Sequence, residues 1–259
     1  SNPLLSNSEM ISYRPPSNHL FGRIILITGA GSGIGKAAAF CCAQAGAKVI
    51  LAGRTTETLE ATYSLIVENN YQEPSIYPLD LEGASTSDYE LLSESIANQF
   101  GRLDGLLQNA SILGQRTPLT YYSPELWDKV MQINVTSQFK MTQCLISVLE
   151  KSSDASVIYT SSGVGRIGRA YWGAYAVSKF AIEGMAQVWA SEIDGLGSIR
   201  MNVINPGATK TQMRADAFPA EDPESLKKPL EIMPVYMYLL GPDSSGVNGQ
   251  SIDAQLPNK

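Results

Sequence analysis

The stretch "RIILITGAGSGIGKAAAFCCAQAGAKVILAGR", residues 23–54, constrains the fold of this chain more than any other feature. An apolar, β-rich run leads into a glycine-rich turn, an alanine-rich helical segment and a second β-rich run. Strand, turn, helix and strand within about thirty residues form a βαβ unit, in which a right-handed crossover makes the two strands parallel. The chain therefore begins as an α/β fold.

The same alternation continues to the end of the chain. Helices are predicted over 56–69, 86–100, 124–150 and 173–194, with one more before the last strand. Further strands are predicted at "SIYPLD", "LDGLLQNA", "ASVIYTSS", "SIRMNVINPG" and "GQSIDA". The pattern predicts a doubly wound (Rossmann) α/β fold, a seven-stranded parallel sheet with helices on both faces.

The chain divides into an arm and one domain. Residues 1–20 are predicted as a flexible N-terminal arm, and residues 21–259 as a single Rossmann-fold domain. Residues 208–230, rich in Pro, Ala and charge, leave the sixth strand at the edge where such sheets bind ligands. We interpret that segment as a candidate lid, with an ordinary surface excursion as the alternative.

The glycine turn "TGAGSGIG", residues 28–35, lies between a predicted strand and a predicted helix. Its glycines let the backbone turn sharply and let a pyrophosphate approach the main chain, which predicts a dinucleotide site. The glycine-rich nucleotide turn of a methyltransferase remains an alternative for this motif alone. The second strand ends with Gly53 where an acid would bind the ribose hydroxyls, and Arg54 follows. This favours NADP(H) over NAD(H), unless Arg54 is only a solvated surface charge.

Composition excludes several classes of function. The single histidine, His19, lies in the predicted arm as a surface residue, so histidine-based hydrolases and zinc sites lack their ligands and bases. The three cysteines, two of them adjacent, form neither a disulfide framework nor a metal-ligand spacing. A net charge of −6 disfavours nucleic acid, and no run of eighteen apolar residues predicts a membrane span. We expect a soluble, cytoplasmic protein without a bound metal.

Tyr175 and Lys179 in "GAYAVSKFAIEG" lie four positions apart and would share one helix face. Among twelve tyrosines such a pair also arises by chance, so the motif alone decides nothing. As an acid/base device it needs a tyrosine pKa lowered from about 10, because a free phenol titrates far above neutral pH. A lysine ammonium and an oxidised nicotinamide nearby would both lower that pKa by Coulomb attraction.

Six motifs together carry a family resemblance: "TGAGSGIG", "QNAS" at 108–111, Asn134, "TSS" at 160–162, "YAVSK" at 175–179 and "NPG" at 205–207. Their order and spacing resemble the short-chain dehydrogenase/reductase family over about residues 22–254. The chain looks most like a bacterial oxidoreductase subgroup with no firmly assigned substrate. Two departures stand out, "QNAS" in place of the family's usual "NNAG" and "IDAQLPNK" without the usual glycine pair after the last strand.

The resemblance implies the reaction and its residues. It implies an enzyme that transfers a hydride between NADP(H) and a carbonyl compound or secondary alcohol. Tyr175 would be the general acid/base, Ser162 would orient the substrate oxygen, Lys179 would lower the tyrosine pKa and hold the ribose, and Asn134 would hold a water relay. A non-catalytic NADP(H)-binding sensor of the same fold is the alternative. The implied cofactor-binding residues are Gly29, Ser32, Gly33, Ile34, Gly35, Arg54, Asp80, Leu81, Asn109, Ala110, Tyr175, Lys179, Pro206, Gly207, Thr209 and Thr211.

The substrate and the assembly are less constrained. Arg166 and Arg169 precede the tyrosine helix and would meet a substrate carboxylate or phosphate, or else be solvated or pair with a neighbouring subunit. Tyr171 and Trp172 would cover a substrate ring or pack against the helix. That helix is apolar over much of its surface, and the resemblance implies pairing with a second copy as a homodimer or homotetramer.

Overall fold

The computed structural model describes residues 4–257, which form the predicted α/β fold. Its sheet has seven strands in the order β3-β2-β1-β4-β5-β6-β7, and every neighbouring pair is parallel. The strands are β1 (Ile24–Thr28), β2 (Lys48–Gly53), β3 (Ser75–Pro78), β4 (Gly105–Gln108), β5 (Ala155–Thr160), β6 (Ile199–Asn205) and β7 (Ser251–Asp253). The predicted seven-stranded doubly wound sheet is thus confirmed.

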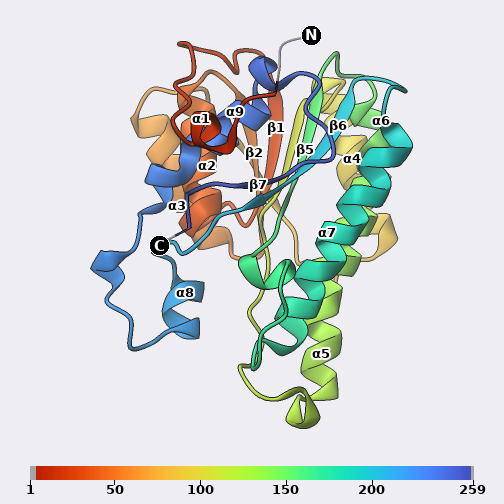
Figure 1. The fold of residues 1–259 in the computed structure, drawn as a ribbon. Helices are drawn as coiled ribbons and strands as arrows, with labels where there is room; N and C mark the ends of the chain where they lie inside the picture. The colour runs from red at the N-terminus through yellow and green to blue at the C-terminus, as the bar shows by residue number, and fades with distance from the viewer. Residues whose placement is uncertain (1–3, 258–259) are drawn as a thin grey trace.

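Helices cover both faces of this sheet (Figure 1). One face carries α2 (Gly33–Gln44), α3 (Thr56–Glu68) and α9 (Met233–Leu240), and the other carries α4 (Thr86–Phe100), α5 (Pro124–Met131), α6 (Ser137–Leu149) and α7 (Gly173–Ile193). The short helices α1 (Asn7–Ile11) and α8 (Gln212–Ala217) lie outside these layers.

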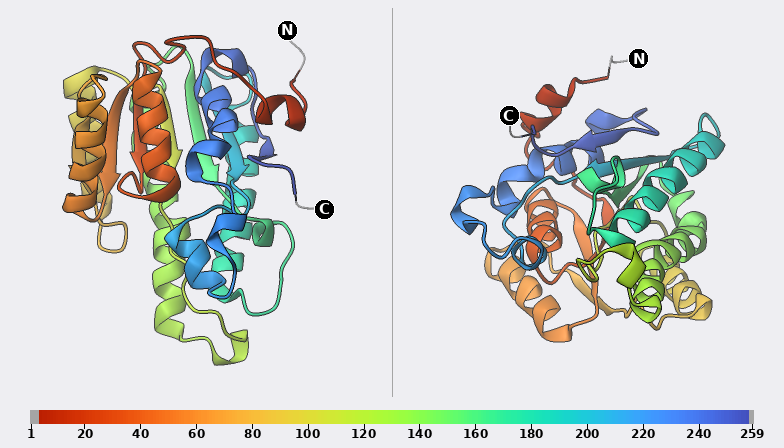
Figure 2. Two further views of the ribbon diagram at one scale, coloured as in Figure 1. Left: turned by 90° about the vertical axis from the view of Figure 1, so that its left-hand side faces the viewer. Right: turned by 60° about the horizontal axis from the view of Figure 1, so that its bottom comes forward.

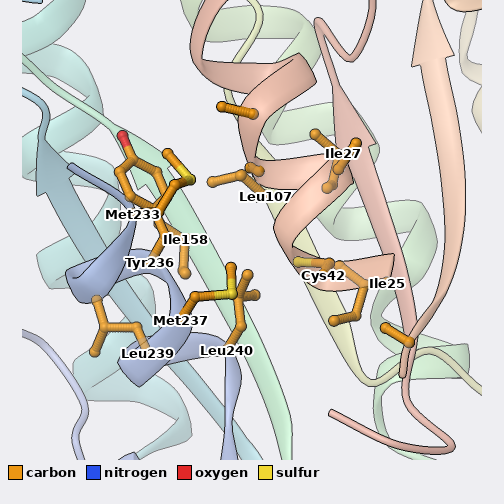
Figure 3. Close-up of a cluster of buried hydrophobic side chains, with 14 of the residues drawn as sticks. Ile25, Ile27, Cys42, Leu107, Ile158, Met233, Tyr236, Met237, Leu239 and Leu240 are labelled. Atoms are coloured by element: carbon orange, nitrogen blue, oxygen red, sulfur yellow. The ribbon is translucent and has the colours of Figure 1, made fainter. Parts of the chain in front are cut away.

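The central strand β1 shows why two layers of helices are needed. All its residues are buried, and alternate side chains join different cores because successive residues of a strand point to opposite faces. Ile25 and Ile27 pack with α2 and α9 in the core of Figure 3, whereas Ile24 and Leu26 pack with α4, α6 and α7. An apolar strand of this kind is stable only between two helical layers.

The predicted helix over 124–150 is interrupted. Residues Gln132–Thr136 form a π-helical turn between α5 and α6, in which the backbone takes one extra residue per turn. Nothing in the apolar periodicity of the segment signals this turn. It places Asn134 inside the fold, where the side chain is fully buried.

The segment predicted as a flexible arm is anchored to the domain at several residues, although residues 14–18 are exposed. Met10 and Leu20 are buried in the core beside α9, and Tyr13 donates a 2.7 Å hydrogen bond to Asp243. His19, expected at the surface, is half-buried and bonds through Nε2 to the carbonyl of Met237 at 3.0 Å. Two separate apolar anchors carry no periodic signal in the sequence, which is why the packing was not predicted. Figure 2 shows α1 beside the C-terminal segment.

Candidate active site

Two adjoining pockets open at the carboxyl edge of the sheet, the lower edge in Figure 1. The glycine pocket, about 380 Å³, is lined by the glycine turn and the ends of β2, β3 and β4. The apolar pocket, about 590 Å³, lies between the loop before α7, the loop after β6 and α8. Tyr175 and Ser161 line both pockets, together with Ile34, Pro206, Thr211 and Met213. Tyr175 therefore stands at the junction of the two hollows.

The glycine turn leaves the N-terminus of α2 open toward the glycine pocket. Gly33 has a φ of 52°, a left-handed conformation that favours glycine, and starts the helix. Ser32 precedes it as the N-cap, but its side chain makes no capping hydrogen bond. A Cβ on Gly35 would lie 2.0 Å from the carbonyl oxygen of Gly29, so only glycine fits there. The first backbone N–H groups of α2 are thus available to an anion.

The far wall of the glycine pocket comes from three successive strand ends. Arg54 follows β2 and is exposed, with no hydrogen bond or ion pair among the described residues. Asp80 and Leu81 follow β3, and Asn109 and Ala110 follow β4. Thr28, at the end of β1, is a site residue that the glycine motif alone does not predict: its hydroxyl accepts 3.0 Å hydrogen bonds from the backbone N–H groups of both Asn109 and Ala110.

The buried start of α7 presents Tyr175 and Lys179 together. The Lys179 ammonium, with a fully buried side chain, donates to the carbonyl of Thr160 at 2.9 Å and lies 5.5 Å from the centroid of the Tyr175 ring. Burial lowers the pKa of Lys179 to about 8, because a low-dielectric surrounding disfavours its charge. Lys179 lies behind the tyrosine rather than in the lining of either pocket.

The expected lowering of the Tyr175 pKa is not found in the protein alone. Burial raises the pKa of Tyr175 to about 12, and the neighbouring Ser162 side chain opposes that rise. Helical spacing predicts the attraction of the lysine charge, but packing also removes the phenol from water. Desolvation of the phenolate is the larger effect. At neutral pH the phenol therefore keeps its proton.

The two candidate serines lie at the end of β5 in different settings. Ser162 lines the apolar pocket, is half-buried, and its hydroxyl accepts from the backbone N–H of Val164 at 3.4 Å. Ser161 is buried and lines both pockets. Of these two serines, only Ser162 affects the pKa of Tyr175, which it lowers.

Asn134 lies beneath the site rather than in it. Its Oδ1 accepts from the backbone N–H of Ile112 at 2.9 Å, and its Nδ2 donates to the Ile112 carbonyl at 2.9 Å and to Ser178 at 3.1 Å. The side chain is therefore engaged at both ends by protein groups. It fixes the loop after β4 against the π turn and α7.

The loop after β6 carries the remaining predicted residues. Pro206 and Thr211 line both pockets, whereas Gly207 and Thr209 line only the apolar one. Gln255, which the sequence reasoning missed, donates through Nε2 to the carbonyls of Pro206 and Ala208 at 3.0 and 2.7 Å. The C-terminal stretch without the glycine pair thus holds this loop in place.

Of the two arginines before α7, Arg166 has surroundings that the sequence did not predict. Arg166 pairs within its own chain, 2.6 Å from Asp253 and 3.4 Å from Glu183. Its charge is therefore neutralised by acidic residues of its own chain. Arg169 is exposed in the lining of the apolar pocket. Trp172 packs on Tyr175 with ring centroids 5.7 Å apart.

Within residues 4–257 no group of three or more histidine, cysteine or acidic side chains is placed to hold a metal ion. No helix in the same range is both long and apolar enough to cross a membrane. The site consists of the glycine pocket, the apolar pocket and Tyr175 at their junction, with Ser162 in the apolar pocket and Lys179 beside the tyrosine. A parallel sheet with these features defines the class of nucleotide-binding α/β oxidoreductases.

Comparison with known proteins identifies the family. The family model described as "short chain dehydrogenase" matches residues 23–222, and the chain belongs to the short-chain dehydrogenase/reductase family. It is 48% identical to "Uncharacterized oxidoreductase YciK" of Escherichia coli (strain K12) over 95% of this chain and 97% of the relative.

Solved structures of relatives share the whole fold. A short chain dehydrogenase from Pseudomonas syringae is 50% identical, with a TM-score of 0.93 over 94% of this chain and 98% of the relative. A short chain dehydrogenase from Escherichia coli CFT073, solved in complex with NADPH, is 48% identical, with a TM-score of 0.90 over 93% and 100%. The resemblance drawn from the six motifs is confirmed.

Proposed function

We propose that the protein is an NADP(H)-dependent oxidoreductase that transfers a hydride between the nicotinamide and a carbonyl compound or secondary alcohol. The observation that carries the proposal is the position of Tyr175, which lines both the glycine pocket and the apolar pocket. A proton donor at such a junction reaches a substrate oxygen while the neighbouring carbon faces the cofactor. We further propose that it works in the cytoplasm, in keeping with free cysteines at 41, 42 and 144.

The glycine pocket fits a phosphorylated dinucleotide. The open N-terminus of α2 suits a pyrophosphate, since its backbone N–H groups and the helix dipole both favour an anion. Arg54 would pair with the 2′-phosphate, and no acid at position 53 repels it. Asp80 and Leu81 would contact the adenine, and Asn109 would brace the inner wall. The NADPH complex of the relative from Escherichia coli CFT073 supports this choice. When bound, the nicotinamide supplies or accepts the hydride.

Tyr175 is the proposed general acid. Because burial raises its pKa to about 12, the phenol is protonated at neutral pH and can give its proton to a carbonyl oxygen. Ser162 would donate a hydrogen bond to the same oxygen and stabilise its developing charge. The Lys179 ammonium, 5.5 Å from the ring centroid, would stabilise the phenolate that remains. A protonated Tyr175 is the form that a general acid in carbonyl reduction requires.

Asn134 is a proposed support for proton return to Tyr175. Since its side chain already bonds to Ile112 and Ser178, a relay water would have to meet its backbone carbonyl. The π turn at Gln132–Thr136 alters the regular helical pairing of carbonyls in that segment. We therefore assign the relay role of Asn134 to its main chain.

The apolar pocket favours an uncharged carbonyl substrate of mainly hydrocarbon character. Its lining includes Leu113, Val164, Ile167, Trp172, Met213 and Phe218. Two of its arginines are already paired, Arg166 with Asp253 and Arg214 with Glu221. A substrate with several anionic groups would find only Arg169 in the lining without an ion pair among the described residues.

We also propose that the protein assembles with a second copy through α7. Val177, Phe180 and Val188 lie along one exposed stripe of this helix, with Phe139 of α6 nearby at 42% exposure. Spacings of three and eight residues keep these side chains on one face. Exposed apolar side chains in such a stripe are typical of a buried interface.

Parallel fluorescence titrations with NADPH and NADH test the cofactor assignment. We expect NADPH to bind the wild-type protein at least about tenfold more tightly than NADH, a difference of about 1.4 kcal/mol. Arg54→Ala should remove most of that preference by weakening NADPH alone, whereas Arg14→Ala, another exposed arginine, should leave both affinities unchanged. Equal binding of the two nucleotides by the wild type would refute the phosphate clamp. Binding of neither would refute the dinucleotide site.

A further inference from the structure

Arg116 lies where three pocket-forming segments meet. It belongs to the loop after β4, and its Nε donates to the carbonyl of Tyr171 at 3.3 Å, in the loop before α7. Its Nη1 donates to the carbonyl of Ala217 at 2.9 Å, at the end of α8. The guanidinium carbon also lies 4.0 Å from the ring centroid of Trp172 and 5.3 Å from that of Phe218. One side chain thus joins all three segments.

Helix α8 has few contacts that hold it to the rest of the domain. Its six residues include none that is buried, although Met213 packs against the cluster of Val164, Tyr175 and Ala176. Within the described part of the chain, a single hydrogen bond joins residues 211–222 to anything outside residues 208–232. That bond is the one from Arg116 to Ala217.

The aromatic contacts of Arg116 lead from α8 to the proposed acid. Phe218 lies 5.8 Å from Trp172 between ring centroids, and Trp172 lies 5.7 Å from Tyr175. A second guanidinium, that of Arg214, lies 3.9 Å from the Phe218 ring and is itself paired with Glu221 at 2.8 Å. Phe218 is therefore in contact with two cations, of which only Arg116 comes from outside the segment.

Backbone strain marks the same place. Tyr171 has a φ of 73°, in the left-handed region that non-glycine residues rarely adopt. The carbonyl of this residue is the one that accepts the bond from Arg116. A strained residue persists only where its surroundings hold it, so Arg116 also stabilises the turn from which Trp172 enters the pocket.

We propose that Arg116 is a positioning residue that latches α8 over the apolar pocket and so forms the wall against which the substrate binds. The inference rests on the proposed function of that pocket. A planar guanidinium is suited to the task because it donates in two directions while stacking on aromatic rings, which a lysine ammonium does not do. Met213, Ala217 and Phe218 line the pocket from this segment, so release of the latch removes one of its walls.

Hydrogen exchange and steady-state kinetics together test the latch. In Arg116→Ala, backbone amides of residues 211–222 should exchange at least about tenfold faster, while those of β1 and β5 stay protected. With NADPH and phenanthrenequinone, an apolar dicarbonyl probe, KM should rise at least about fivefold with kcat changed less than about twofold. KM alone should change because the wall contacts the bound substrate and the transition state equally, so its loss weakens binding without slowing the chemical step.

Matched variants separate the latch from general damage. Arg116→Lys should behave like Arg116→Ala, and Arg14→Ala should behave like the wild type. Phe218→Ala removes the ring on which Arg116 stacks. Residues 211–222 of the double variant should therefore exchange no faster than those of Arg116→Ala alone. If Arg116→Ala fails to fold, hydrogen exchange in Phe218→Ala still tests the aromatic part of the latch, whereas its KM does not, because Phe218 itself lines the pocket.

Two results would overturn the proposal. Unchanged exchange in residues 211–222 of Arg116→Ala would show that α8 does not depend on the arginine. Fully additive effects of Arg116→Ala and Phe218→Ala would show that the two do not act as one contact. A wild-type protein that reduces no carbonyl would instead refute the proposed function, and the exchange measurement would still decide the latch.

Discussion

Lys179 is the residue whose surroundings say most about the chemistry. An amine with a fully buried side chain is costly, and here only the Thr160 carbonyl accepts a hydrogen bond from it among the described residues. Burial lowers its pKa to about 8, close to the pH at which enzymes work. Groups with pKa values shifted toward neutrality are typical of functional sites.

The activity should depend on the charge of this amine. In the proposed mechanism the ammonium would stabilise the phenolate left on Tyr175 below pH 8, and the neutral amine above pH 8 would not. We therefore expect kcat/KM for NADPH-dependent reduction to be level near pH 6–7 and to fall with an apparent pKa of about 8.

A pH profile of the wild type beside Lys179→Arg tests this expectation. The arginine stays charged, so the alkaline fall near pH 8 should vanish even if the overall rate is lower. A wild-type profile that is level through pH 9.5 would contradict the role given to the ammonium.

The π turn at Gln132–Thr136 decides how the elements around the site fit together. It buries Asn134, whose side-chain amide accepts from the N–H of Ile112 and donates to its carbonyl. These are the two hydrogen bonds that a neighbouring strand would otherwise make to the loop after β4. That loop forms the wall between Ala110 and Leu113, in contact with both pockets.

Removing this amide should destabilise the domain. Asn134→Ala leaves the part-buried N–H and carbonyl of Ile112 without their partner, at a cost of about 1–2 kcal/mol each. We expect the melting temperature to fall by roughly 4–15 °C for a chain of this size. Asn98→Ala, an exposed asparagine of α4, serves as the control, and equal melting temperatures for the two variants would contradict the bracing role.

Elements were predictable from local signals, and their cross-connections were not. The helix predicted over 86–100 is found at Thr86–Phe100, since a capping box at Ser85 and a left-handed Gly101 mark its ends. The apolar runs predict the strands, and the glycine motif predicts the turn after the first of them, just as well. By contrast, the contacts of Gln255 with Pro206 and of Arg166 with Asp253 join residues far apart in sequence. Such contacts exist only once the sheet has formed, so no local pattern predicts them.

The pKa of Tyr175 shows the same limit at the site. The pairing of Tyr175 with Lys179 follows from helical spacing, but the degree of burial follows from the packing of Trp172 and the pocket walls. Helical spacing therefore predicts the tyrosine beside its lysine, but the desolvation that raises the pKa of Tyr175 in the protein alone depends on tertiary packing.

At the scale of the whole molecule, one apolar face has no partner within the described chain. Val177, Phe180 and Val188 of α7 are 36%, 45% and 60% exposed. We expect a homodimer whose mass by light scattering is twice the 28.0 kDa of one chain. Phe180→Glu with Val188→Glu should yield the monomer, because charge on this face cannot be buried without a partner.

Leu196→Glu is the control for that experiment. Leu196 is 81% exposed beyond the end of α7, so its replacement should leave the dimer intact. A wild-type protein that is already monomeric at micromolar concentration would contradict an interface on α7.

The central claim is that Tyr175 gives the proton to a carbonyl oxygen as NADPH gives the hydride. The direct measurement is the rate of NADPH oxidation with phenanthrenequinone by Tyr175→Phe, beside a fluorescence titration of the same samples with NADPH. Phenylalanine keeps the ring between Trp172 and Lys179 and removes only the hydroxyl. We predict that kcat falls by about 10²–10⁴ while the affinity for NADPH changes less than about threefold. A variant that binds NADPH and keeps full turnover would contradict the account, and a wild-type protein that binds NADPH but reduces no carbonyl would favour a nucleotide sensor.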